Sequence, residues 1–169
     1  MNWIGAILLI SACSLIGFDH ANRLKKRPEQ LLLFKNALQI MEAEIIYSQF
    51  PISDICLHIA NQISKPLDVF FNNIGEQMKN NNQLDNLWKE EIEQLDMSSS
   101  LDRKDLDILR QFGATLGHYD LDQQQKQLQL TLLHLDRLLT EAQKNCLLFS
   151  KVYRGIGILT GILLALILI

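Results

Sequence analysis

The stretch LQLTLLHLDRLLTEAQKNCLLFSKVY, from Leu128 to Tyr153, decides the fold class of this chain. Apolar side chains recur in it at alternating spacings of four and three residues, which is the repeat of one face of an α-helix. The positions that carry the repeat are Leu128, Leu132, Leu135, Leu139, Ala142, Cys146, Phe149 and Tyr153. No Pro or Gly interrupts the pattern before Gly155, so it predicts one helix of roughly 45 to 50 residues that continues to the C-terminus.

Both ends of the chain are apolar. Neither Trp3–Phe18 nor Gly155–Ile169 contains a charged residue, although 21% of the 169 residues are charged. Because a helix satisfies its own backbone hydrogen bonds in lipid, these runs predict transmembrane helices at 1–19 and 153–169. Each run is slightly short of the roughly 20 residues that a span usually needs. A buried core helix is the alternative for either run.

The N-terminal run has a further alternative. Ile10–Cys13, with the sequence ISAC, resembles the processing box of a lipoprotein. A signal peptide, however, has a basic start, and no basic residue precedes this run. The apolar residues also continue past Cys13 to Phe18. We therefore favour an uncleaved membrane anchor.

Basic residues flank both predicted spans on the side of the middle segment. They are Arg23, Lys25, Lys26 and Arg27 in a collar at 20–27, and Lys144, Lys151 and Arg154 around the start of the second span. Because Lys and Arg accumulate on the cytoplasmic side of a membrane, residues 28–152 are predicted to form a cytoplasmic domain. Between Pro28 and Ala142, nine basic residues stand against eighteen acidic ones, a formal net charge of −9. Such a surface does not suit nucleic-acid binding.

Five further helices are predicted in the middle segment, the first opening at Pro28, a position that suits proline. The first four are expected to run from Pro28 to Pro51, Ser53 to Ile63, Pro66 to Lys79, and Leu84 to the serine cluster Ser98–Ser100. The fifth is expected to be capped by that serine cluster and to run to Leu116. No segment shows the alternation of a strand. The predicted fold class is therefore all-α, a bundle of about six helices whose last helix is continuous with the C-terminal span.

The stretch FGATLGHYDLDQQQ, Phe112 to Gln125, has the composition of a site but fits a corner between two helices. Gly117 is placed to close one helix in the left-handed conformation. Asp120 and Gln123 have the spacing of a capping pair for the next helix. Gly113, one turn before Gly117, removes a side chain from the same face and permits the close approach of another helix.

The sequence contains no motif that would carry catalysis. A phosphate-binding glycine loop, HExxH, a nucleophile elbow and CxxC are all absent, so we predict no enzyme, no cofactor and no metal site. Cys13, Cys56 and Cys146 are widely spaced and are interpreted as buried or membrane thiols. Glu42 and Glu44 are two residues apart and so lie on different faces of a helix.

Two surfaces are candidates for protein contacts. Glu90, Glu91 and Glu93 are predicted to form a solvated acidic face. Gly157, Gly161 and Ala165 form a ladder of small residues, which lets helices pack closely in lipid. The first span is the expected partner of this ladder, and homo-oligomerisation or packing against another membrane protein are alternatives.

Three segments, together with both apolar ends, resemble the stage III sporulation protein AB family of endospore-forming bacteria. The segments are Lys26–Ile55, Leu109–Leu135 and Tyr153–Ile169. The most specific positions are Arg27-Pro28, Glu42 with Glu44 and Tyr47, the FGxxLGxxD run of Phe112, Gly113, Gly117 and Asp120, and Gln124 or Gln125. These positions, with Gly157 and Gly161, are the candidate interaction residues.

The resemblance implies a component of the channel complex that links mother cell and forespore, located in the mother-cell membrane around the forespore. It implies a cytoplasmic domain similar to the six-helix domain of type II secretion and type IV pilus platform proteins. The implied partners are a secretion-type ATPase, the AA protein of the same operon, and other membrane proteins of that operon. We expect a non-enzymatic bundle that couples the ATPase to membrane components through the last helix, with acidic residues docking the ATPase.

Two other functions remain open. One is a membrane-anchored metal-binding module in which Glu42, Glu44, His118 and Asp120 converge. The other is a scaffold without ATPase contact.

Overall fold

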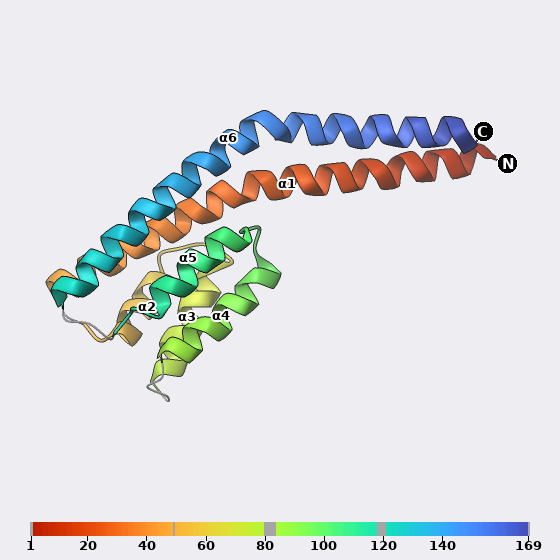
Figure 1. Cartoon of the computed structure of the whole chain (residues 1–169). Helices are drawn as coiled ribbons and strands as arrows, with labels where there is room; N and C mark the ends of the chain where they lie inside the picture. The colour runs from red at the N-terminus through yellow and green to blue at the C-terminus, as the bar shows by residue number, and fades with distance from the viewer. Residues whose placement is uncertain (1, 49, 80–83, 118–120, 169) are drawn as a thin grey trace. The chain divides into compact units, whose positions relative to one another are not determined.

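The computed structural model of the chain describes residues 2–48, 50–79, 84–117 and 121–168 (Figure 1). Regular structure in these residues is entirely helical, which confirms the predicted all-α class. The elements are α1 (Asn2–Ala43), the π-helical turn η1 (Glu44–Ser48), α2 (Ile52–Ala60), α3 (Leu67–Met78), α4 (Leu84–Ser98), α5 (Arg103–Gly113) and α6 (Leu121–Leu168). The long helix expected at the C-terminal end is α6, which has 48 residues.

The chain divides into two compact units. Unit 1 consists of Met1–Pro28 and Thr140–Ile169, and unit 2 of Glu29–Leu139. Within unit 1, the beginning of α1 and the end of α6 lie side by side (Figure 1), and the rings of His20 and Tyr153 stack with their centroids 5.9 Å apart. Unit 2 contains α2 to α5 and the adjoining parts of α1 and α6.

Aromatic side chains form the centre of unit 2. Phe34 of α1, Phe70 and Phe71 of α3, Trp88 of α4 and Phe112 of α5 are all buried, and neighbouring rings have centroids 5.0 to 6.1 Å apart. Tilted and edge-to-face pairs of this kind add about 0.5–1.5 kcal/mol each beyond the area that they bury. One aromatic cluster therefore ties four helices together.

The apolar stripe that predicted α6 faces the core in unit 2. Leu128 and Leu135 have no exposed surface, and Leu139 is buried. The helical repeat of the sequence is thus used for packing, which supplies most of the stability of helices in proteins.

The first helix does not begin at Pro28, because Pro28 lies inside α1. A proline removes one backbone hydrogen bond and costs about 3 kcal/mol within a helix. Packing outweighs that cost here, since Arg27 directly before the proline and Leu31 one turn after it are both buried. The prediction relied on a local preference that the burial of these neighbouring residues overrides.

Three other helix ends differ from the prediction. Pro51, expected to end the first helix, is the N-cap residue of α2, and Ser53 lies within its first turn. The reason is that proline has no N–H to leave unpaired at a helix start. The cap of α5 is Asp102 rather than the serine cluster, because the carboxylate of Asp105 accepts a hydrogen bond of 2.8 Å from the Asp102 N–H. α5 also ends at Gly113, and the buried Leu116 lies in the turn that follows this helix.

In the part of the chain that the structure describes, no helix combines the length and the apolar character needed to cross a membrane. The spans at 1–19 and 153–169 and the domain boundaries derived from them stay predictions.

Candidate interaction sites

The indole of Trp88 fills the space that a side chain on Gly113 would occupy. A Cβ atom placed on Gly113 would lie 2.0 Å from Cδ1 of Trp88 and 2.3 Å from its Cγ. The indole is held in place by its Nε1–H, which donates a hydrogen bond of 2.8 Å to the Leu109 carbonyl of α5, and by the Phe112 ring at 5.5 Å. The close approach that Gly113 permits is thus that of a tryptophan side chain from α4.

Gly117 forms the corner after α5. Its φ of 82° lies in the left-handed region, where a Cβ atom is strained. Space is not the constraint, because a Cβ atom there would meet Ile52 at 3.6 Å and Leu84 at 3.7 Å, which are ordinary contacts. His118 and Asp120, which the sequence placed in this corner, lie outside the described residues.

The carboxylates of Glu42 and Glu44 bind to different parts of unit 2. Oε1 of Glu42 accepts a hydrogen bond of 3.3 Å from Gln129 of α6. Oε1 of Glu44 lies 2.9 Å from Nδ1 of His58 on α2, and Nε2 of the same ring lies 3.0 Å from the Gln62 amide. In the described residues, no three His, Cys, Asp or Glu side chains gather as metal ligands. Nothing here brings Glu42 and Glu44 to one ion.

The environment of Glu44 favours its charged form. Its pKa is lowered first by a hydrogen bond from the Ser48 side chain, and then by the hydrogen bond and the charge of His58. Partial burial acts in the opposite direction. This cluster therefore ties η1 to α2 most firmly when Glu44 is ionised.

The other candidate interaction residues differ in how far their side chains are exposed to solvent. Tyr47, in η1, is 85% exposed, so its ring is available to a partner. Phe112, Gly113 and Gln124 are buried and contribute to packing. Gly157 and Gly161 belong to α6, but their surroundings lie outside the described side chains.

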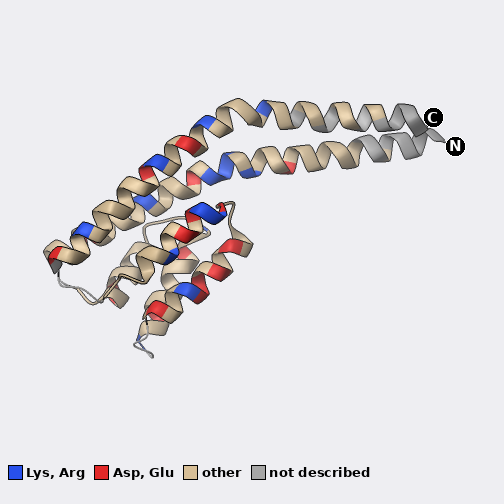
Figure 2. Cartoon of the chain, viewed as in Figure 1, with Lys and Arg blue, Asp and Glu red and all other residues tan. Residues whose placement is uncertain are grey.

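The three glutamates of α4 do not form one solvated face. Glu90 and Glu93 are exposed, together with Asp85, Asp96 and a single lysine, Lys89 (Figure 2). Glu91 is only 3% exposed, which corrects the prediction. The helical period explains the difference, because Glu91 lies three and four residues from the buried Trp88 and Leu95.

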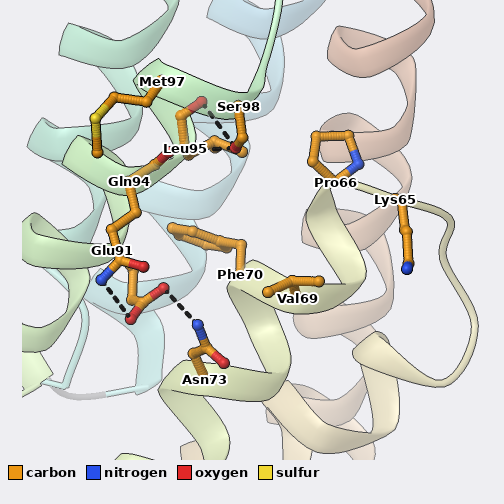
Figure 3. Close-up of a pocket in the computed structure, with 10 residues that line it drawn as sticks. All are labelled: Lys65, Pro66, Val69, Phe70, Asn73, Glu91, Gln94, Leu95, Met97 and Ser98. Carbon is orange, nitrogen blue, oxygen red and sulfur yellow. Dashed lines mark hydrogen bonds between the residues drawn. The ribbon is translucent and has the colours of Figure 1, made fainter.

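Glu91 forms part of the wall of a pocket between α3 and α4 (Figure 3). The pocket has a volume of about 370 Å³ and is lined by Lys65, Pro66, Val69, Phe70, Asn73, Glu91, Gln94, Leu95, Met97 and Ser98. Oε2 of Glu91 accepts a hydrogen bond of 3.0 Å from Asn73, and Oε1 accepts bonds of 3.2 Å from Gln77 and 3.4 Å from Gln94. No sequence motif marks this site, although Pro66, Val69 and Asn73 have the spacing of one helix face.

The chain has clear relatives. The sequence model of the family described as "Stage III sporulation protein AB" matches residues 2–169. "Stage III sporulation protein AB" of Bacillus subtilis (strain 168) is 31% identical over 166 residues, which are 98% of this chain and 97% of that protein. A solved structure of "Stage III sporulation protein AB (SpoIIIAB)" is similar with a TM-score of 0.67 at 31% identity, and the match covers 72% of this chain and 96% of that one. The similarity in sequence thus extends over nearly the whole length of both proteins.

Proposed function

The chain belongs to the stage III sporulation protein AB family, and from that premise we propose that it is a non-enzymatic platform component of a sporulation channel complex. In this role its helical unit binds a cytoplasmic secretion-type ATPase and couples it to membrane components. The ATPase is the AA protein encoded in the same operon. The complex lies in the mother-cell membrane around the forespore.

The acidic exposed face of α4 is the observation that carries the ATPase contact. The exposed charged residues of this helix are four acidic ones, Asp85, Glu90, Glu93 and Asp96, and one basic one, Lys89 (Figure 2). A surface of one sign attracts a surface of the opposite sign and speeds association with it. The face therefore suits a basic surface on the ATPase.

The apolar surface of unit 1 supports the proposed attachment to a membrane. Leu8, Leu15 and Ile16 of α1 and Leu159 and Leu163 of α6 are 59% to 69% exposed. Large apolar side chains gathered at this exposure need an apolar environment. The basic collar at 20–27 suits the anionic headgroups beside such an environment. We therefore propose that 1–19 and 153–169 cross the membrane and that the residues between them are cytoplasmic.

The uninterrupted course of α6 supports coupling. This helix runs from Leu121 in unit 2 to Leu168 in unit 1 without a loop. A continuous helix joins the two units more stiffly than a flexible linker would.

Co-purification of the full-length protein with the ATPase from detergent-solubilised membranes tests the contact. We expect the wild-type chain to retain the ATPase and the variant Glu90→Lys/Glu93→Lys to lose most of it. The matched control is Asp54→Lys/Glu76→Lys, which makes the same change in charge at exposed positions of α2 and α3 and should retain the ATPase. Full retention by the α4 variant would exclude that face. Failure of the wild-type chain to bind would leave a scaffold without ATPase contact.

A further inference from the structure

Glu91 is a buried carboxylate whose described partners are all neutral. Asn73, Gln77 and Gln94 donate to it through their amide nitrogens. In the described part of the chain, no basic side chain lies within ion-pair distance of it. A buried charge is costly unless it is paired, and the three amides satisfy the hydrogen bonds of Glu91 without balancing its charge. The net negative charge of this site would therefore favour a cation that enters the pocket.

The pocket beside Glu91 has the shape and lining for one long basic side chain. Pockets of about 300 to 1,000 Å³ hold whole small ligands, so a volume of about 370 Å³ suits a single extended group. The rim is apolar and open, since Val69 is 49% and Met97 84% exposed, and Leu95 and Phe70 lie deeper. Aliphatic stems of basic side chains pack on such surfaces while the charged head reaches a polar group.

The acceptors in the pocket favour a guanidinium over an ammonium group. Glu91 has about four acceptor positions, three of which are taken by amides, and the amides of Asn73 and Gln94 keep their oxygens as acceptors. A guanidinium carries five donors in a planar fork and is less strongly hydrated than an ammonium group. An arginine can therefore use several of these acceptors at once.

The position of the pocket indicates where the arginine comes from. Glu90 and Glu93 are exposed on α4, each one helical turn before a residue that lines the pocket, Gln94 and Met97 respectively. A basic surface drawn to the α4 face would bring its side chains to the mouth of the pocket. We propose that the pocket between α3 and α4 receives an arginine side chain of the ATPase, with Glu91 as its counter-ion. This step rests on the proposed function.

A small probe tests the pocket independently of the ATPase. Butylguanidinium is titrated into the isotope-labelled full-length protein in micelles, and the side-chain amide NMR signals of Asn73 and Gln94 are followed. Saturable shifts are expected for the wild-type chain and none for Glu91→Gln. Butylurea, which has a similar shape without the charge, should not saturate. Lys65→Met should bind the probe at least as tightly as the wild-type chain, because Lys65 also lines the pocket and repels a cation.

The second arm measures the affinity of the ATPase for the same full-length protein. Glu91→Gln should weaken binding at least about ten-fold, whereas the exposed Glu90→Gln should weaken it less than about three-fold, because a buried charge pair matters more than a rim charge. Val69→Trp blocks the mouth without changing a charge and should also weaken binding at least about ten-fold. Thermal melting by circular dichroism shows whether each variant is folded.

The outcomes separate the two proposals. Equal responses to butylguanidinium and butylurea, or saturable probe binding that persists in Glu91→Gln, would overturn the pocket as an arginine site. If the ATPase binds the wild-type chain, Glu91→Gln and Val69→Trp with the same affinity, the pocket does not receive the ATPase, and the proposed function stands. If the ATPase does not bind the wild-type chain at all, the proposed function fails and the ATPase is not the source of the arginine.

Discussion

Replacing Gly113 with alanine introduces a methyl group into the space that the Trp88 indole occupies. The new Cβ atom would lie 2.0 Å from Cδ1 of Trp88, whereas ordinary contact begins at 3.4 Å, so the ring or α5 must shift by the difference of 1.4 Å. A shift of this size also breaks the 2.8 Å hydrogen bond from Trp88 to the Leu109 carbonyl.

The cost follows from three contributions. Overpacking a core costs about 1–3 kcal/mol. Leaving the buried indole N–H without a partner costs about 1–3 kcal/mol. Alanine has a higher helix propensity than glycine, which returns about 1 kcal/mol. We therefore expect Gly113→Ala to lower the free energy of unfolding by roughly 1 to 5 kcal/mol, with a central value near 3, out of a total of roughly 5–15 kcal/mol.

Urea unfolding of the full-length protein in detergent, followed by far-ultraviolet circular dichroism, measures this loss. The matched control is Gly155→Ala in α6, where an added Cβ atom has no neighbour within 4 Å. The free energy of unfolding of this control variant should equal that of the wild-type chain or exceed it by up to about 1 kcal/mol. A double-mutant cycle with Trp88→Leu isolates the contact, because a smaller side chain at position 88 leaves room for the methyl group.

Two results would refute this account. Gly113→Ala could be as stable as the wild-type chain, which would mean that the indole does not lie against Gly113. Alternatively, the methyl group could cost the same in the Trp88→Leu background, which would place the strain elsewhere.

Three further predictions concern single residues of unit 2. Gly117→Ala should lower the free energy of unfolding by about 1–2 kcal/mol, because alanine is strained at a φ of 82°, and Gly117→Asn should lose less in the same urea experiment. Because the pKa of Glu44 is lowered on folding, its stabilising contribution is complete above its ordinary pKa of 4.5 and is lost as the pH falls through the lower folded value. The melting temperature of Glu44→Gln should therefore fall less than that of the wild-type chain below that pH, and an equal fall would remove Glu44 as the cause. Burial raises the pKa of Cys56 to about 12, so mass spectrometry after iodoacetamide treatment should find it less reactive than the partly exposed Cys146 until the protein unfolds.

The sequence predicts those features that depend on a repeat or on one special backbone angle. The stripe from Leu128 to Tyr153 predicts α6 because a helical period over many turns has few other interpretations. Gly117 was expected to be left-handed because a glycine between two helices commonly closes the first one. Neither inference needs knowledge of a distant residue.

The features that were missed depend on tertiary contacts. Pro28 is tolerated inside α1 because Arg27 and Leu31 on either side of it are buried, which no local pattern shows. Gly113 marks a close approach, but only the fold identifies Trp88, 25 positions earlier in the sequence, as the side chain that makes it. Glu91 was grouped with Glu90 and Glu93 by charge, whereas its phase on α4 places it with Trp88 and Leu95.

The aromatic core gives unit 2 its own optical signal. The chain has two tryptophans, of which Trp3 belongs to unit 1 and Trp88 to unit 2. Trp88 is surrounded by Phe70, Phe71 and Phe112 and is shielded from water, so its emission should be blue-shifted in the native state and move to the red when unit 2 opens. Replacing Trp3 with phenylalanine would leave Trp88 as the single tryptophan, whose emission reports on unit 2 alone, without labelling or truncating the chain.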